Sequence, residues 1–249
     1  MIAVEFSPSG FAAIIDAARM SGYAFVRPDE QADQGLLLRH DVDLSLRSAV
    51  QLAELEASLG VASTFFVMAR SAFYSVTSPE AAGLLRRIVD AGHAIGLHWD
   101  AGLYDGSDAA AAVTREIDLL QWITGTRCIA ISHHQPSLHG LVEIDIPGVV
   151  NMYAPKVQEQ YAYVSDSCMS FRDDPFATLA RRAPLQLLLH PEYWSPGGSS
   201  LEAVCRELAL QESQIAVQRF DRECELMIQT VRRRPEFDGD LRRSMTPGA

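Results

Sequence analysis

The sequence predicts an α/β fold, an irregular (β/α) barrel of about seven strands. Helical and strand-like segments alternate along the first half of the chain, which is typical of a parallel sheet with crossover helices. Four apolar runs end in histidine or aspartate, and ligands of parallel α/β folds bind where strands end. The chain has 249 residues, 48% of them hydrophobic, which suffices for one core. We expect one barrel domain over residues 1–249 with a long C-terminal helix.

The N-terminal half alternates between helices and strands. Serine or proline at a helix start and glycine after its end are typical helix boundaries. Short runs rich in leucine, β-branched or aromatic residues predict strands. These signals predict strands over 23–26, 36–43, 63–67 and 94–97, and helices from Ser7 to Met20, Leu44 to Leu59, Ser78 to Gly92 and Ser107 to Gly125.

The loops lengthen in the C-terminal half. Strand-like runs cover 128–131, 149–153, 161–164 and 185–189, and a helix is predicted from about Ser199 to Arg233. Residues 137–160 carry the weakest signals and fit a β-rich excursion over the site. The chain shows no internal repeat or linker, which favours one distorted barrel over two domains.

The most informative strand ends in three charged residues. Arg39, Asp41 and Asp43 alternate along this strand, so they share one face of the sheet. Two carboxylates about 7 Å apart along a strand can divide two tasks, one holding a metal and the other acting as a base. The alternative is an acidic turn in which Arg39 pairs with Asp41.

Histidines gather at the ends of other predicted strands. Five of the seven stand there, namely His40, His98, His133, His134 and His190. Because the carboxyl ends of parallel strands meet at one face, these side chains predict one shared polar site. Two histidines do not fit, His93 before its strand and His139 in a loop, and we expect them to be structural or solvated.

Composition narrows the possible functions. The net charge of −11 argues against nucleic-acid binding as a main role. No apolar run approaches the roughly 20 residues that span a bilayer, and the first residues lack the features of a signal peptide. The cysteines show no short paired spacing, which indicates free thiols in a reducing compartment. We expect a cytoplasmic location; the oligomeric state is not predicted.

Four ordered segments resemble the motifs of the polysaccharide deacetylase family, whose members remove acetyl groups from N-acetylated sugars. These segments are Arg39–Asp43, Ser63–Val67, Gly92–His98 and Leu188–His190. Each is weakly specific alone, but the four occur in the family's order and span most of the chain. The resemblance implies an irregular β/α barrel of about seven strands, in agreement with the strand count.

The resemblance also implies catalytic and metal-binding roles. Asp41 would be the general base and His190 the general acid, while Asp43 and His98 would bind one divalent metal, most simply zinc. The family's usual second histidine, four residues after the first, is here Gly102. The third ligand is therefore absent or comes from elsewhere.

Other polar residues complete the predicted site. We expect His134 or Asp100 to be the third metal ligand, with His134 preferred. Substrate contacts are expected from Arg39, His133, Asp100 and Asp166. Asp166 could alternatively orient Arg39 or His190, or it could be an ordinary loop carboxylate.

Three functions are compatible with this site. The first is a metal-dependent deacetylase that removes an acetyl group from an N-acetylated sugar, or from a lipid-linked or nucleotide-linked glycan precursor, in cell-surface polysaccharide synthesis. The alternative, motivated by the missing second histidine, is a non-catalytic deacetylase-like protein that binds glycan or assembly partners. A metal hydrolase of another amide or ester is a third possibility. The metal content of the purified protein, measured with and without chelation, distinguishes the first two functions.

Overall fold

The computed structural model describes residues 4–104, 109–194 and 199–232 and divides into two units. One unit spans Met1–Val204 and the other Cys205–Ala249. Helix α8 (Leu201–Arg232) lies where the sequence predicts the long C-terminal helix. Among the described residues, no helix is both long enough and apolar enough to cross a membrane.

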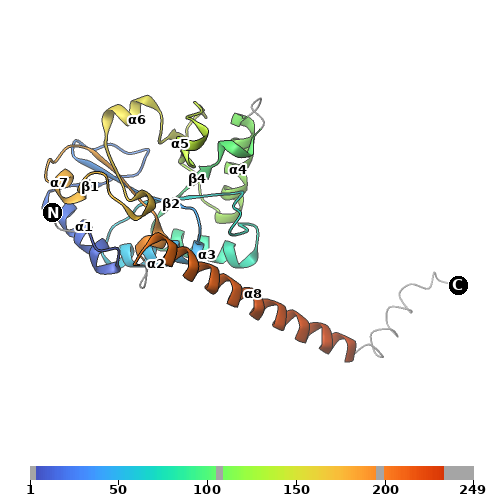
Figure 1. The fold of residues 1–249 in the computed structure, drawn as a ribbon. Coiled ribbons are helices and arrows are strands. Elements are labelled where there is room, and N and C mark those ends of the chain that lie inside the picture. The colour runs from blue at the N-terminus through green and yellow to red at the C-terminus, as the bar shows by residue number, and fades with distance from the viewer. Residues whose placement is uncertain (1–3, 105–108, 195–198, 233–249) are drawn as a thin grey trace. The chain divides into compact units, whose positions relative to one another are not determined.

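The first unit is built around one sheet of parallel strands (Figure 1). Seven strands follow the order β6-β5-β4-β3-β2-β8-β7, and β1 pairs with the start of β2. In the described residues β6 and β7 do not pair with each other, so the barrel is open there. This confirms the predicted fold class. The strands are β1 (Ala24–Phe25), β2 (Gly35–Val42), β3 (Thr64–Val67), β4 (Ala94–Trp99), β5 (Ala130–His133), β6 (Val150–Asn151), β7 (Ala162–Ser165) and β8 (Leu185–Leu189).

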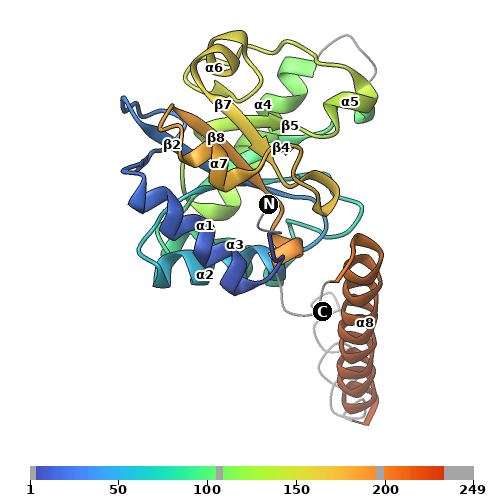
Figure 2. The same cartoon turned by 60° about the vertical axis from the view of Figure 1, so that its left-hand side comes forward.

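Helices surround this sheet, and α1, α2 and α3 lie next to one another (Figure 2). The side chains of Ser7, Ser45 and Ser78 cap these three helices by accepting a backbone N–H from the first turn, which satisfies one otherwise unpaired donor in each. The predicted start of the fourth helix, 107–108, lies outside the described residues. The helices of this unit are α1 (Pro8–Met20), α2 (Leu46–Ser58), α3 (Pro79–Asp90), α4 (Ala109–Thr124), α5 (Pro136–His139), α6 (Pro155–Gln160) and α7 (Pro175–Leu179).

The prediction of a β-rich excursion over residues 137–160 is wrong. In this segment the described structure has the two-residue strand β6, one isolated bridge between Ile146 and Val149, and the short helices α5 and α6. Proline opens both helices, at Pro136 and Pro155, where its fixed φ favours the first helical turn and its missing N–H costs nothing.

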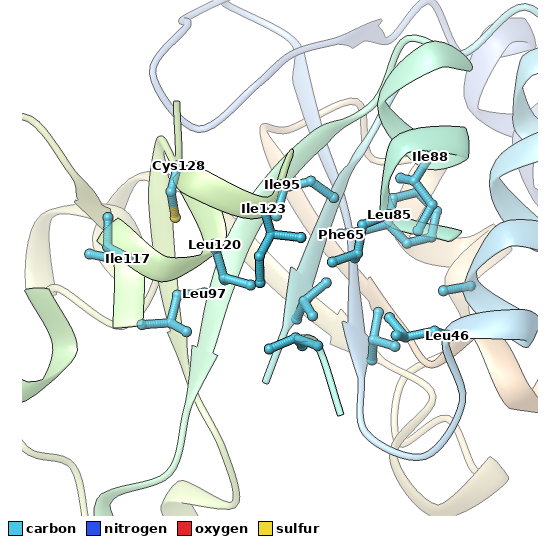
Figure 3. Packing of buried hydrophobic residues seen from close by; sticks show 14 of the residues in the cluster. Leu46, Phe65, Leu85, Ile88, Ile95, Leu97, Ile117, Leu120, Ile123 and Cys128 are labelled. Carbon is cyan, nitrogen blue, oxygen red and sulfur yellow. The ribbon is translucent and has the colours of Figure 1, made fainter. Parts of the chain in front are cut away.

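The pleat of the central strands separates two hydrophobic clusters. Phe65, Ile95 and Leu97 pack against buried side chains of α2, α3 and α4 (Figure 3). Phe66 and Leu37 belong to a different cluster, together with residues from β5 and the β6 region. Successive strand side chains point to opposite faces, so one face packs on the helices and the other faces the barrel interior.

His40 lies on the helix-facing side of β2 and does not belong to the polar site. Its Nε2 hydrogen-bonds Glu56 Oε1 of α2 at 2.7 Å, and Ser63 Oγ donates to the other oxygen of Glu56 at 2.6 Å. His93 joins this buried group through Ser63 and the Ala53 carbonyl. The expectation that His40 shares the site is therefore corrected, because its position alternates with Arg39 and Asp41.

We predict that Gly96→Ala destabilises the barrel. A Cβ at Gly96 of β4 would lie 2.6 Å from the Phe66 ring and 3.0 Å from the Ala130 carbonyl oxygen. Overpacking of this kind costs about 1–3 kcal/mol, which thermal unfolding would measure. Gly83→Ala in α3 is the matched control, because apart from the adjacent backbone of its own helix no described atom lies within 4 Å of the added carbon, and alanine favours a helix by about 0.8–1 kcal/mol. A Gly96→Ala protein as stable as the wild type would contradict this packing.

Candidate active site

A cavity of about 800 Å³ opens where the central strands end. Its lining includes Asp41, Asp43, His98, His134 and His190, which stand on or directly after β2, β4, β5 and β8. The volume lies within the usual range for small-molecule sites. The sequence-based expectation of a polar site at the strand ends therefore agrees with where these side chains lie.

Three ligand atoms form a compact triangle in this cavity. His98 Nε2 lies 3.1 Å from Asp43 Oδ1, His134 Nδ1 lies 3.4 Å from the same oxygen, and the two nitrogens are 3.0 Å apart. Ligands on a tetrahedral zinc ion are separated by about 3.3 Å, given metal–ligand bonds of about 2.0–2.1 Å. The three side chains thus fit one face of a tetrahedral ion.

A hydrogen bond on the far side of His98 suits this arrangement. Nδ1 of His98 lies 3.2 Å from the Ser132 carbonyl oxygen, and a carbonyl can only accept, so we assign the ring proton to Nδ1. That tautomer leaves the lone pair of Nε2 directed toward Asp43 and His134. Metal-ligating histidines are commonly oriented in this way.

Electrostatics favours a charged carboxylate at Asp43. Burial would raise the pKa of Asp43, but its close contacts with His134 and His98 hold it well below its usual range. Conversely, burial would lower the pKa of His134, and the contact with Asp43 raises it above the usual value. The side chains that stabilise the carboxylate are therefore the same ones that complete the triangle.

Asp41 is held by a buried hydrogen-bond network. Arg39 Nη2 donates to Asp41 Oδ2 at 2.9 Å and to Ser132 Oγ at 2.8 Å, and the Ser132 hydroxyl donates to Asp41 Oδ2 at 3.2 Å. Oδ1 of Asp41 is buried and accepts no hydrogen bond from the described residues. One oxygen is therefore fixed, while the other remains available at the cavity.

Arg39 is a positioning residue in this geometry. Its guanidinium lies between the rings of Phe66 and Tyr153, with centroids 5.2 and 5.3 Å away, and Gln186 accepts a further hydrogen bond. The side chain is only 1% exposed and does not line the cavity. Burial would raise the pKa of Asp41, but Arg39 lowers it. Arg39 thus holds Asp41 in its charged form, and the substrate contact expected of Arg39 stays a prediction.

His190 is oriented by a buried carboxylate. Its Nδ1 hydrogen-bonds Asp166 Oδ1 at 2.6 Å, and the backbone N–H of His190 donates to the same carboxylate. Trp194 Nε1 donates to Asp166 Oδ2 at 2.9 Å. Of the three roles considered for Asp166, the geometry favours orienting His190. The carboxylate is fully buried and does not line the cavity, and the substrate contact expected of it stays a prediction.

The other nitrogen of His190 faces the ligand triangle. His190 Nε2 lies 3.8 Å from Asp43 Oδ2. Burial would lower the pKa of His190, but the Asp166 carboxylate outweighs it and raises the pKa to about 10. The imidazole therefore carries a proton at neutral pH, on the side where a substrate would bind.

The two remaining predicted residues lie at the cavity wall. Asp100 is not part of the ligand triangle, and its Oδ1 accepts the backbone N–H of Gly102 at 2.8 Å, capping a short turn. His133 packs on Trp99, with ring centroids 4.5 Å apart, and its Nδ1 contacts the His134 carbonyl. Both line the cavity, so their substrate contacts stay predictions.

Several supporting residues were not found from the sequence. Ser132 shares the strand face of His134 and could have been identified by alternation. Tyr153, Gln186 and Trp194 carry no such signal, because their contacts with Arg39 and Asp166 depend on how separate segments fold together.

Comparison with known proteins gives matches among solved structures alone. No family model and no curated protein matches the chain. The chain is similar to family 4 carbohydrate esterases. One from Bacillus anthracis is 14% identical, with 81% of this chain and 86% of that chain covered and a TM-score of 0.42. A Bacillus subtilis peptidoglycan deacetylase is 14% identical, with 89% and 100% covered and a TM-score of 0.42. A pseudoenzyme of the same family from Bacillus anthracis is 17% identical, with 74% and 63% covered and a TM-score of 0.42.

We predict that Asp166→Asn lowers the pKa of His190. The variant keeps a hydrogen-bond acceptor but removes the negative charge that stabilises the imidazolium, and an adjacent opposite charge typically shifts a pKa by about 1–3 units. Histidine titration by NMR on metal-free protein measures the change. His93, which does not contact Asp166, serves as the internal control. An unchanged titration of His190 would mean that its protonation does not depend on Asp166.

Proposed function

We propose that this protein is a metal-dependent deacetylase that removes the acetyl group from an N-acetylated sugar. The observation that supports the proposal best is the triangle of Asp43, His98 and His134, with Asp41 and His190 beside it. Such a site contains the parts that amide hydrolysis needs: a metal position, a base and an acid.

Asp43, His98 and His134 would hold the metal, for which zinc is the simplest choice given two imidazole ligands and one carboxylate. Three protein ligands leave a fourth position for water or substrate, as in catalytic zinc sites. A bound ion would polarise the acetyl carbonyl and lower the pKa of a water molecule.

Asp41 would act as the general base. Its Oδ2 is fixed by Arg39 and Ser132, while Oδ1 has no partner among the described residues. Because Arg39 keeps the pKa of Asp41 low, the carboxylate is ionised at neutral pH and can accept a proton. The fixed oxygen limits rotation, so Oδ1 is presented in one direction.

His190 would act as the general acid. Its Nδ1 is bound to Asp166, which leaves Nε2–H as the proton that can be delivered. This nitrogen lies near Asp43 and hence on the metal side of the cavity. A departing amine is a poor leaving group without a proton, so a protonated imidazole at this position suits amide cleavage.

The cavity volume and the free cysteines support a proposal for the substrate and its compartment. A volume of about 800 Å³ accommodates a sugar residue with its acetamido group. We propose a lipid-linked or nucleotide-linked glycan precursor of cell-surface polysaccharide, handled in the cytoplasm. The four cysteines are all free, which suits a reducing compartment.

A non-catalytic glycan-binding or assembly protein is the alternative. The sequence favours this alternative because Gly102 stands where the family usually has a second histidine. His134 weighs against this alternative, because its nitrogen lies 3.0 Å from that of His98 and fills the missing place in the ligand set.

We predict that zinc binding depends on His134. The His134→Ala and His98→Ala proteins should each lose at least about 10-fold in zinc affinity, since a ligand and not merely a supporting contact is removed. Isothermal titration of chelator-treated protein measures the affinity. His133→Ala is the matched control: its ring packs on Trp99 instead of entering the triangle. Equal losses in all three variants would indicate a folding defect, and no loss in His134→Ala would remove it from the ligand set.

We predict that Asp41→Asn keeps zinc but lowers acetate release from an N-acetylated sugar by about 10²–10⁴-fold, because the amide cannot accept the proton. Asp43→Asn should instead weaken zinc binding. Acetate release and zinc content are measured on the same samples. Recovery of Asp41→Asn activity by excess zinc would show that Asp41 is a ligand. A zinc-loaded wild type that releases no acetate from any N-acetylated sugar or precursor would contradict the proposed function.

A further inference from the structure

Glu192 is a buried carboxyl group to which the proposed mechanism gives no task. It lies in the short 3-10 turn Pro191–Trp194, two residues after His190. Its side chain lines the active-site cavity, yet the residue is only 2% exposed. Neither carboxyl oxygen has a hydrogen-bond partner among the described residues.

The other fully buried carboxylates near the strands are paired. Glu56 has Ser63 and His40 as partners, and Asp166 binds His190 and Trp194. A buried polar group left without a partner costs about 1–3 kcal/mol, and such groups are rare in native proteins. Glu192 therefore carries a cost that a ligand in the cavity would relieve.

The protonation of Glu192 indicates what kind of ligand suits it. Burial raises the pKa of this carboxyl to about 8; the neighbouring His190 lowers it and Asp43 raises it further. The raised pKa favours the neutral acid, which has one donor and at least one acceptor. A hydroxyl group also offers one donor and two acceptor sites, so the two are complementary.

Glu192 is not one of the candidate metal ligands. The cluster of possible ligand atoms consists of Asp43, His98 and His134. Glu192 follows His190 by two residues, and the lining of the same cavity includes the exposed ring of Phe73. A cavity that offers both an apolar ring and a hydrogen-bonding carboxyl group suits a sugar, which has both an apolar face and hydroxyl edges.

We propose that Glu192 is a specificity-determining residue that hydrogen-bonds a hydroxyl group of the sugar ring carrying the acetamido group. This inference rests on the proposed function for the reaction, but the contact itself concerns binding. A site built around a hydroxyl discriminates strongly against an analogue that lacks it, because the buried group is then left unpaired.

The test combines sugar binding with stability in two variants. Glu192→Met keeps the side-chain volume but removes both polar atoms, and Glu192→Gln keeps a donor and an acceptor. The probes are N-acetylglucosamine, its oligomers and its single-deoxy analogues, titrated onto zinc-loaded protein. Acetate release from these sugars and from p-nitrophenyl acetate, which carries no sugar ring, is measured in parallel. Glu54→Gln, an exposed carboxylate on α2 paired with Arg87, is the control.

Glu192→Met should weaken sugar binding about 10-fold, the loss expected for one hydrogen bond, while the Gln variant retains most of it. Hydrolysis of the ester, which has no sugar ring to bind, should fall much less than hydrolysis of the sugars in Glu192→Met. Thermal unfolding of Glu192→Met should occur about 2–4 °C higher, because the unpaired buried group is gone. One deoxy analogue should bind wild type and Glu192→Met equally, which identifies the hydroxyl.

Contrary outcomes separate this inference from the proposed function. Unaltered sugar binding in Glu192→Met, or a wild type that binds none of the probes, overturns the inference. Equal losses on sugar and ester would place Glu192 at the reacting centre or in the fold and overturn it as well. Sugar binding that depends on Glu192 without any acetate release would leave the inference standing and overturn the deacetylase function.

Discussion

Alternation of side chains along parallel strands is the constraint on which the site depends. Every second residue of β2 faces the barrel interior, so Leu37, Arg39 and Asp41 follow one another there, while His40 points to α2. The same alternation brings His98 from β4 and Ser132 from β5 to that side. Because all the strands run parallel, their polar ends meet at one mouth, and residues far apart in sequence become neighbours.

The partners of the buried charged side chains also fix the orientation of the proposed base and acid. Arg39 lies between two aromatic rings and binds one oxygen of Asp41, and Asp166 is held by Trp194 and the backbone of His190. Buried charges are tolerated only with such partners, and each partner also removes a rotational freedom. The proposed base and acid are thereby preorganised before substrate binds.

The sequence predicted the strand ends well and the supporting contacts poorly. Asp41, Asp43 and His98 could be identified from strand alternation and family resemblance, because both are read from short stretches of sequence. The third ligand was left open between Asp100 and His134, because no local pattern says how far β4 and β5 extend beside each other. In the structure Asp100 turns back to cap Gly102, whereas the backbone N–H of His134 binds the Trp99 carbonyl and its ring reaches His98. The sequence also could not decide between the possible roles of Arg39 and Asp166. Whether each side chain is buried depends on contacts with residues far away in the chain, such as Tyr153 beside Arg39.

The central claim is that one metal ion binds the triangle of Asp43 after β2, His98 of β4 and His134 after β5. The most direct measurement is a crystal structure of zinc-loaded protein with anomalous data at the zinc edge. A single peak within about 2.0–2.2 Å of Asp43 Oδ1, His98 Nε2 and His134 Nδ1 is predicted. A zinc peak that is bonded to Asp100 in place of His134, or that lies away from this cavity, would contradict the account.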